Sequence, residues 1–463
     1  MSTAKPASAS SSTPKTPIVS PIASPIASPA VSQLAPRFVG ALRDLSLASR
    51  RELIDRARSS TDEALEARVR DILKRVRSGG DGALRELSRE IERVELDAFE
   101  VPRHVIDDAL AATSPELRRA LERAARNIAT VHRAFLPAAI EIESEPGVVV
   151  GRRPDPLAAV GVYAPGGRAA YPSSVLMGVV PARVAGVREV IVLSPPGPSG
   201  RPSDVVLAAA AIAGASRVFS LGGAQAVGAM AFGTESVPRV DRIVGPGNAY
   251  VAEAKRQVAG YVGIDAPAGP SEILILADED ASPACIVREL LAQAEHDPDA
   301  SVVALVEGPA LHEAVLAGLA ASSPARRDVV ASALASRSAV LWVDHLEDAL
   351  ELAEAYAAEH LLIAARDPEA WLPRIRHAGT VFLGEAASVA FGDYLTGANH
   401  VLPTAGLARS FSGLSTLDFV RWTTWQRVTP AAARALRDDA ALLAEAEGLP
   451  AHAEAARGAA GGA

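Results

Sequence analysis

Four short segments of the chain carry side chains that can bind a cation or move a proton. Gln293 and His296 stand three residues apart in an Ala- and Leu-rich run, so a helix there would project both side chains from one face. Asp393 and His452 add a carboxylate and a second imidazole, which completes a ligand set suited to zinc or a similar first-row metal. Each has a plainer interpretation, because Gln-x-x-His is usually a surface helix face, Asp393 follows a glycine as turn residues do, and a histidine near the C-terminus is usually solvated.

The adjacent residues Glu359 and His360 can act as an acid–base pair. They stand where a helix expected over 350–358 meets the apolar run Leu361–Ile363. A histidine in this position can titrate near neutral pH and accept a hydroxyl proton, and the neighbouring carboxylate can act on the proton of a water molecule. The alternative is a pair at a helix C-terminus, where a histidine interacts favourably with the helix dipole. The two residues alone do not decide between these interpretations.

Composition excludes several classes of partner. The 463 residues carry a formal net charge of −9 and contain no basic tract, which argues against binding to nucleic acid or to an anionic membrane surface. No run approaches the roughly 18 consecutive apolar residues that a transmembrane helix needs. Cys285 is the only cysteine, so no disulfide can form within the chain, and we expect it to be a buried helix residue of a cytoplasmic protein.

Residues 1–36 differ from the rest of the chain. They consist mostly of Ser, Ala, Pro and Thr and contain the near-repeat Ile-Ala-Ser-Pro at 22–25 and 26–29. Such a segment cannot bury enough apolar surface to offset its ordering entropy, so we predict a disordered tail. A transit peptide is the alternative, but the segment lacks the amphipathic basic face of one.

The remaining pattern predicts an α/β fold. Helical spacing of apolar residues dominates 40–145 and returns over 430–457. Between them, short apolar runs that end at Gly or Pro alternate with helical segments, which is typical of mostly parallel sheets covered by helices and suggests two such units. The expected strands are Val190–Leu193, Val218–Leu221, Ile243–Val244, Ile273–Ala277, Val302–Val306, Val340–Val343 and Val381–Leu383.

No strand is followed by Gly-x-Gly-x-x-Gly, the glycine fingerprint of dinucleotide-binding folds. The nearest segment, Gly245–Tyr250, lacks the third glycine and would by itself be interpreted as a tight turn. The motif alone therefore predicts no dinucleotide site.

The order and local context of these segments resemble the histidinol dehydrogenase family from about residue 40 to residue 457. The segments that carry the resemblance are GVYAPGGRAAYPSSVLMGVVPARVAGV at 161–187, GGAQAVGAMAFGTESVP at 222–238, VGPGNAYVAEAKRQV at 244–258, IDAPAGPSEILILADE at 264–279, LLAQAEHDPDA at 290–300, AAEHLLI at 357–363, FGDYLTGANHVLPT at 391–404, FSGLSTLDFVRWTTWQ at 411–426 and AEAEGLPAHAEA at 444–455.

The resemblance implies two incomplete Rossmann-like parallel-sheet domains with helical N- and C-terminal extensions, in an intertwined homodimer. Domains of this kind bind NAD without the glycine fingerprint, so its absence is expected. The implied boundaries are a disordered tail over 1–36, an N-terminal helical extension over 37–60, a discontinuous catalytic domain over 61–160 and 271–414, a second Rossmann-like domain that contacts NAD over 161–270, and a C-terminal helical extension over 415–463 that reaches the partner subunit.

The resemblance also implies a zinc-dependent, NAD-linked four-electron oxidation of L-histidinol via L-histidinaldehyde to L-histidine, the last step of histidine biosynthesis. His360 would be the base for both oxidations, and Glu359 the activator of the attacking water. One Zn²⁺ per subunit would be held by Gln293, His296, Asp393 and His452, and the imidazole and amino nitrogens of the substrate would join it. The implied substrate contacts are Ser271, Gln293, His296, His360, Asp393, His400, Glu447 and His452, and the implied NAD contacts are Tyr163, Gln225 and Asn248.

Two competing hypotheses stay open at the level of the sequence. A paralogue of the same family would oxidise another small alcohol, such as a sulfonated diol, and would differ at His400, Glu447 and the metal set, which look complete for an imidazole amino alcohol. A zinc hydrolase would instead use Glu359 to activate a metal-bound water. Formation of NADH from histidinol would distinguish a histidinol dehydrogenase from both of these alternatives.

Overall fold

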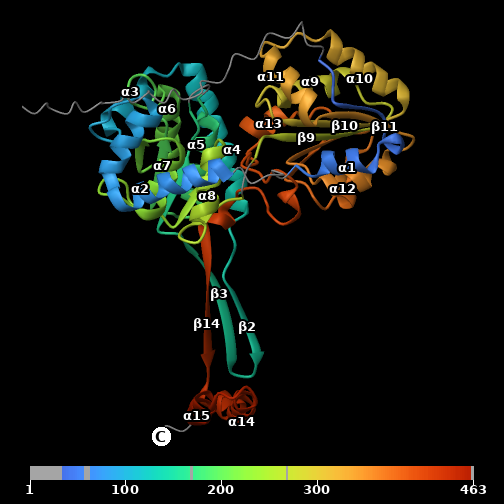
Figure 1. The fold of residues 1–463 in the computed structure, drawn as a ribbon. Helices are drawn as coiled ribbons and strands as arrows, with labels where there is room; N and C mark the ends of the chain where they lie inside the picture. The colour runs from blue at the N-terminus through green and yellow to red at the C-terminus, as the bar shows by residue number, and fades with distance from the viewer. Residues whose placement is uncertain (1–33, 57–62, 167–169, 267–268, 460–463) are drawn as a thin grey trace, which may run out of the picture. The chain divides into compact units, whose positions relative to one another are not determined.

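The computed structural model describes residues 34–56, 63–166, 170–266 and 269–459. Its strands form two parallel sheets and one antiparallel sheet, and helices cover both faces of each parallel sheet (Figure 1). The predicted α/β class and the two parallel-sheet units are thereby confirmed. None of the described helices is long and apolar enough to cross a membrane.

The first parallel sheet has six strands: β1 (Phe38–Ala41), β9 (Glu272–Ala277), β10 (Ser301–Glu307), β11 (Ala339–Val343), β12 (His360–Ala364) and β13 (Thr380–Leu383). Their order across the sheet is β1-β11-β10-β9-β12-β13. After their first residues, β9 and β12 are continuous buried runs of Ile, Leu and Ala, as expected for strands covered on both faces. One face is covered by α9 (Pro283–Ala294), α10 (Pro309–Ala321) and α11 (Arg327–Arg337), and the other by α1 (Leu47–Ile54) and α12 (Leu350–Tyr356) (Figure 1).

The second parallel sheet has five strands: β4 (Ala159–Tyr163), β5 (Glu189–Ser194), β6 (Arg217–Ser220), β7 (Arg242–Val244) and β8 (Gly263–Ile264). Their order is β6-β5-β4-β7-β8, so the chain first builds outward from β4 on one side and then adds β7 on the other. One face is covered by α3 (Arg103–Ala112), α4 (Pro115–Ala134), α5 (Pro172–Val184) and α6 (Asp204–Ala213), and the other by α2 (Glu63–Leu87), α7 (Gly223–Phe232) and α8 (Ala249–Val258).

The third sheet is an antiparallel ribbon of β2 (Ile140–Glu145), β3 (Val148–Pro156) and β14 (Val420–Val428), with β3 in the middle. β14 leads into α14 (Pro430–Ala446), which begins with Thr429 as its N-cap and a proline in its first turn, and then α15 (Pro450–Gly458). Figure 1 shows α14 and α15 beyond the far end of β14. These two helices confirm the helical block predicted over 430–457.

All seven predicted strands are present, but the helical prediction over 40–145 is wrong at both of its ends. Phe38–Ala41 is a strand that pairs with β11, so the N-terminal extension over 37–60 is not wholly helical. Ile140–Glu145 is a strand in which Ile and Glu alternate, and a period of two residues identifies a strand rather than a helix.

The grouping of 61–160 with 271–414 also needs correction. Helices α2, α3 and α4 pack on the five-stranded sheet, because their apolar residues belong to the cores on its two faces. Val76 of α2, for example, lies in the same core as Ile191 of β5. The domain boundaries themselves stay a prediction.

The predicted disordered tail falls outside the described residues except at its end. Leu34 is 2% exposed and belongs to the core of the six-stranded sheet. The prediction of disorder up to residue 36 is therefore wrong at Leu34, where one large apolar side chain decides the outcome.

Candidate active site

The candidate catalytic residues lie at the amino ends of two neighbouring strands. His360 is the first residue of β12, Glu359 directly precedes it, and Ser271 directly precedes β9, which pairs with β12. Open α/β sheets usually bind ligands at the carboxyl ends of their strands, so this site lies at the opposite edge. The polar residues at this edge stand just before the apolar runs that form the strands.

Two helices bring further polar residues to the same edge. Helix α9 crosses back from β9 toward the start of β10, and its last turn holds Gln293, with His296 two residues beyond the helix. The His296 N–H donates to the Gln293 carbonyl oxygen at 3.3 Å, so the helical geometry continues far enough to keep the two residues on one face. Asp393 is the next-to-last residue of helix α13 (Val389–Tyr394). Glu289 of α9 accepts hydrogen bonds from Ser388 and from the Val389 N–H, and thereby joins the two helices.

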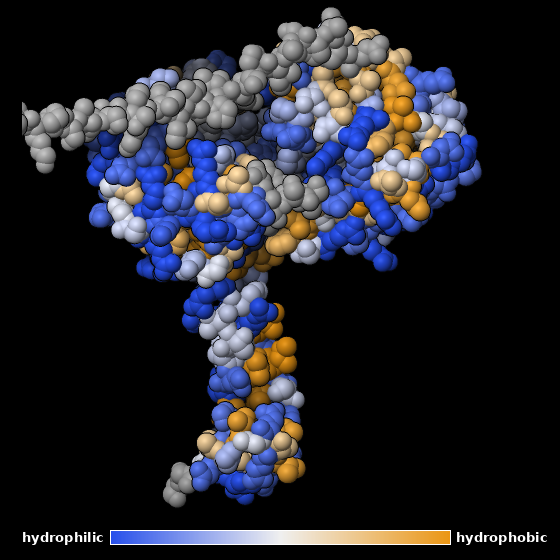
Figure 2. All heavy atoms as spheres, viewed as in Figure 1, coloured by the Kyte–Doolittle hydropathy of each residue, from blue (hydrophilic) through white to orange (hydrophobic). Residues whose placement is uncertain are grey.

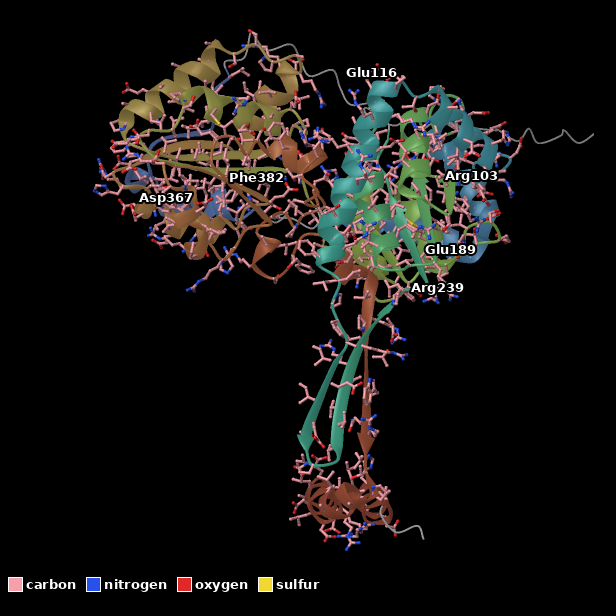
Figure 3. All side chains as sticks on the ribbon, turned by 180° about the vertical axis from the view of Figure 1, so that it is seen from behind. Arg103, Glu116, Glu189, Arg239, Asp367 and Phe382 are labelled. Atoms are coloured by element: carbon pink, nitrogen blue, oxygen red, sulfur yellow. The ribbon has the colours of Figure 1, made fainter. Side chains whose placement is uncertain are left out.

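His360 is held by its Nδ1 atom. The ring nitrogen lies 2.9 Å from the carbonyl oxygen of Glu272, and because a carbonyl oxygen only accepts, Nδ1 carries the proton. Nε2 is buried without a hydrogen-bond partner among the described residues and lies 3.6 Å from Asp393 Oδ1. Phe382 of β13, labelled in Figure 3, lies against the ring at a centroid distance of 5.9 Å. In its neutral form the ring therefore presents the lone pair of Nε2 as a base.

Glu359 is also held by the main chain of Glu272. Its Oε2 accepts a hydrogen bond from the Glu272 N–H at 2.7 Å and lies 3.4 Å from His360 Nδ1. Burial raises the pKa of Glu359, while the His360 ring favours its ionised form. Burial lowers the pKa of His360, but the charges of Glu359 and Asp393 outweigh burial and raise that pKa well above its ordinary value. One residue, Glu272, thus fixes both members of the acid–base pair through its main chain.

The side chain of Glu272 is itself anchored by a buried ion pair. Arg56 donates two hydrogen bonds to the Glu272 carboxylate, at 2.7 and 2.9 Å, and one to the Tyr356 carbonyl oxygen at 2.7 Å. The Ala405 N–H also donates to this carboxylate, at 2.9 Å. Both charged side chains are almost completely buried, so loss of either partner leaves an uncompensated charge in the core.

Asp393 and His400 form a second linked pair. The ring of His400 donates from Nδ1 to the Asp393 carbonyl oxygen at 2.9 Å, and its Nε2 lies 3.4 Å from the Ser174 hydroxyl of α5. Burial raises the pKa of Asp393, but its interactions with His360, His400 and His296 outweigh burial and lower that pKa. The structure therefore brings together three of the predicted ligand or substrate residues around one ionised carboxylate.

Gln293, His296 and Asp393 fit a metal site that is incomplete in one chain. The Gln293 amide nitrogen is buried without a partner among the described residues, so the amide is free to turn its oxygen toward a cation. His296 is close enough to Asp393 to influence its pKa. No cluster of three or more His, Cys, Asp or Glu with metal-binding geometry occurs among the described residues. An amide, an imidazole and a carboxylate make three ligands of the type that first-row metals accept, with a fourth position left over.

The fourth predicted ligand, His452, lies elsewhere in the chain. His452 and Glu447 are exposed on α15 and at the end of α14, beyond the ribbon. The nine residues of β14 span about 30 Å at the usual rise of a strand. Figures 1 and 3 both show that this ribbon separates the two helices from the parallel sheets of the chain. These two residues are therefore not brought to the site by their own chain.

The predicted cofactor residues gather at the carboxyl ends of strands in the five-stranded sheet. Tyr163 ends β4, and its hydroxyl accepts a hydrogen bond from the Gly223 N–H at 3.1 Å. Burial and the nearby Glu92 raise the pKa of Tyr163 to about 12. Gln225 is 1% exposed, and neither amide atom has a hydrogen-bond partner among the described residues. An enclosed tyrosine hydroxyl and an enclosed amide without partners, beside a pair of glycines, can serve a polar ligand such as a dinucleotide, and the contacts with NAD stay a prediction.

The Gly245–Tyr250 segment combines a strained turn with a helix cap. Gly245 has φ +113°, and a Cβ there would lie 2.1 Å from the Tyr163 carbonyl oxygen, so only glycine fits. Asn248 caps α8 by accepting from the N–H groups of Tyr250 and Val251. The chain bends at Gly245 and enters α8 at Ala249, and the role of Asn248 in contacting NAD stays a prediction.

Sequence reasoning missed the residues that position the site. Arg56 and Glu289 lie in none of the segments that carry the resemblance, and Glu272 was assigned no role although it follows Ser271 directly. Apart from contacts within α9, the partners of Glu272 and Glu289 at the site are more than 80 residues away in sequence. The only local signal was a charged residue, Glu272, at the head of the apolar run Ile273–Ala277. A charge at the start of a fully buried strand has to find a partner, which predicts a buried ion pair but not its other member.

The α/β fold places a buried Glu–His pair beside Gln293, His296 and Asp393, an arrangement of the kind found in α/β enzymes. Residues 55–458 match the family model described as histidinol dehydrogenase. The histidinol dehydrogenase of Methanosarcina barkeri is 45% identical over 419 residues, which cover 90% of this chain and 96% of that protein. That of Methanothermobacter thermautotrophicus is 46% identical over 408 residues, with 88% and 96% covered.

A solved structure agrees with these relatives. The crystal structure of histidinol dehydrogenase from Elizabethkingia anophelis superposes with a TM-score of 0.87 at 33% identity, over 92% of this chain and 98% of that one. The chain belongs to the histidinol dehydrogenase family. Family membership sets aside the hydrolase interpretation of Glu359.

Proposed function

We propose that the chain oxidises L-histidinol via L-histidinaldehyde to L-histidine with two molecules of NAD, as the last step of histidine biosynthesis in the cytoplasm. The observation that carries this proposal is the orientation of the His360 ring. Its Nδ1–H is fixed on the Glu272 carbonyl oxygen, so the buried Nε2, which faces Asp393, is the atom that can take up and release a proton. A base with this geometry can take the proton of a substrate hydroxyl.

The two members of the acid–base pair have separate tasks. In the first stage His360 removes the hydroxyl proton while the carbinol hydrogen leaves as hydride. In the second stage Glu359 takes a proton from the water that adds to the aldehyde, and His360 again removes the hydroxyl proton of the hydrate. NAD, when bound, accepts one hydride in each stage. Four electrons leave the substrate in total, which is the difference between an alcohol and a carboxylate.

The metal-binding residues orient the substrate. Gln293, His296 and Asp393, together with His452 of the partner subunit, would hold one Zn²⁺ per subunit. The metal would supply a positive site that accepts the imidazole and amino nitrogens of histidinol. We assign the remaining substrate contacts to Ser271, which precedes β9, to His400, whose Nε2 is oriented by its Nδ1 hydrogen bond to Asp393, and to Glu447 of the partner subunit.

The partner in this proposal is a second copy of the chain, and two observations support it. His452 and Glu447 are exposed at the end of a ribbon and do not reach the site of their own chain. Leu442 and Leu443 of α14 are 64% and 68% exposed, and Ile142 of β2 is 61% exposed. Figure 2 shows such apolar residues along the ribbon and over the helices at its end. Burial of large apolar side chains stabilises a dimer at about 25 cal/mol per Å².

The direct test uses the full chain with zinc, NAD and histidinol. We expect two equivalents of NADH per histidinol and L-histidine as the product. His360→Asn removes the base and should abolish NADH formation, whereas His345→Asn, at a histidine with 77% side-chain exposure, should not. A sulfonated diol offered in place of histidinol tests the paralogue hypothesis. Faster turnover of the diol, or no NADH from histidinol, contradicts the proposed function.

A further inference from the structure

A carboxylate that the proposed mechanism does not use is enclosed beside the five-stranded sheet. Glu92 is the last residue of the π-helical turn Ser88–Glu92, which follows α2. Both of its carboxylate oxygens are buried, and neither has a hydrogen-bond partner of standard geometry among the described residues. Burial raises the pKa of Glu92 to about 7, although Ser88, the Gly222 N–H and Gln225 lie close enough to oppose that effect. Burial of a carboxylate without partners costs free energy, so a functional role for Glu92 is worth examining.

Glu92 lies where two strands end and a helix begins. A Cβ placed on Gly222 would lie 2.6 Å from Glu92 Oε1 and 2.6 Å from Pro195 Cγ, so Glu92 and Pro195 both approach Gly222 closely. Pro195 directly follows β5, and Gly222 is the N-cap of α7. The carboxylate therefore faces the carboxyl edge of the sheet, the edge that also carries Tyr163 and Gln225.

Two further polar side chains, Tyr163 and Gln225, are enclosed beside Glu92. Gln225 is 1% exposed, and neither amide atom has a hydrogen-bond partner of standard geometry among the described residues. The charge of Glu92 helps to raise the pKa of Tyr163, so these two groups lie near each other. The Tyr163 hydroxyl accepts from Gly223, which leaves its own proton to donate. The three side chains therefore lie beside one another at this edge of the sheet.

The chemistry of these groups selects the kind of ligand. The helix N-terminus at Gly222 would attract an anion, but the carboxylate of Glu92 already supplies the negative charge there, and a second anion would be repelled. A neutral group rich in hydroxyl donors satisfies the carboxylate and the amide together. In conventional dinucleotide folds an acidic residue after the second strand binds the ribose 2′-hydroxyl of the adenosine half. Here the second strand, β5, ends in Ser194-Pro195 and has no such acid, and Glu92 brings a carboxylate to the same place from another part of the chain.

We propose that Glu92 is a specificity-determining residue of the cofactor site, where it accepts hydrogen bonds from the adenosine ribose hydroxyls of NAD and disfavours the 2′-phosphate of NADP. This inference rests on the proposed function, because it takes NAD as the cofactor of this chain. Glu92 would supply the carboxylate that the residues directly after β5 lack.

The test measures binding as well as turnover. The dissociation constants of NAD⁺ and NADP⁺ are measured by titration calorimetry for the full-length protein, for Glu92→Gln and for Glu95→Gln, an exposed acid three residues away that serves as the control. Glu92→Gln keeps the shape and removes the charge, so it should fold at least as well as the parent protein. NAD⁺ affinity should fall about tenfold, as expected for loss of a hydrogen bond to a charged group, and NADP⁺ affinity should stay equal or rise. The KM for histidinol and the zinc content should not change.

The outcomes separate this inference from the proposed function. Unchanged NAD⁺ binding in Glu92→Gln, with normal binding in the parent protein, overturns the role of Glu92 and leaves the proposed function intact. Equal weakening of NAD⁺ and NADP⁺ shows that the carboxylate only supports the turn at Gly222, which also overturns the inference. Absence of NAD⁺ binding in the parent protein overturns both.

Discussion

His360 and Glu272 are joined by a 2.9 Å hydrogen bond between the ring Nδ1 and the main-chain carbonyl oxygen, and the N–H of the same Glu272 binds Glu359. One residue at the amino end of β9 therefore fixes His360 and Glu359, the proposed base and the proposed activator of water, relative to each other. The buried ion pair with Arg56 fixes that residue in turn. Arg56, which lies outside β9 and β12, thus helps to position Glu359 and His360 through Glu272.

Loss of Arg56 should destabilise the protein. Arg56→Met leaves the Glu272 carboxylate buried and unpaired, so we expect the free energy of unfolding to fall by about 3–5 kcal/mol. Denaturant unfolding of the full chain measures this, with Arg51→Met on the exposed side of α1 as the control. A loss no larger than that of the control would show that Glu272 finds another partner.

Glu359→Gln should separate the two oxidation stages. The amide keeps the shape of the side chain but cannot take a proton from water, so oxidation that starts from the aldehyde should fall more than oxidation of histidinol to the aldehyde level. His360→Asn should impair both stages. Stopped-flow measurement of each half-reaction checks the difference, and an equal loss in both stages of Glu359→Gln would refute the division of roles.

The fold followed from the sequence wherever one local pattern decided it. The apolar runs Ile273–Ala277 and Val302–Val306 are strands because nothing else buries such short runs on both faces. Phe38–Ala41 was missed because its place in the sheet depends on pairing with β11, about 300 residues away. The catalytic, metal-binding and substrate-contacting residues were predicted from the family resemblance. Arg56 could not be predicted because its partner Glu272 is 216 residues away and only the fold brings the two together. Glu92 could not be predicted because only the fold shows that its carboxylate is buried.

Acid should destabilise the protein through His132. Both ring nitrogens are buried without partners among the described residues, and burial lowers the pKa of His132 from 6.5 to about 4. A depressed pKa means that this stability is present above pH 6.5 and is lost as the pH falls toward 4, by up to about 3 kcal/mol. His132→Gln should lose less stability over that range than the parent protein, and His104→Gln, at an exposed histidine, should not differ from it. Parallel pH profiles for all three proteins would contradict this.

Metal retention should depend on His296. A chelator should abolish NADH formation, and zinc or manganese should restore it. His296→Ala removes one of the few protein ligands and should weaken zinc retention by about 100-fold or more, measured as zinc content after dialysis against graded chelator. The exposed His345→Ala is the control. Full activity in metal-free protein would show that these residues do not serve a metal.

The shared site is the central claim, and mixed dimers test it most directly. One chain carries His360→Asn and the other His452→Ala, so each homodimer has two damaged sites. In a mixed dimer, one site combines an intact His360 with an intact His452 from the other chain. Random reassortment makes about half of the dimers mixed, so co-refolding should restore about a quarter of the parent activity in NADH formation from histidinol. Activity that stays at the level of the separate variants, although mixed dimers form, would show that His452 serves its own chain.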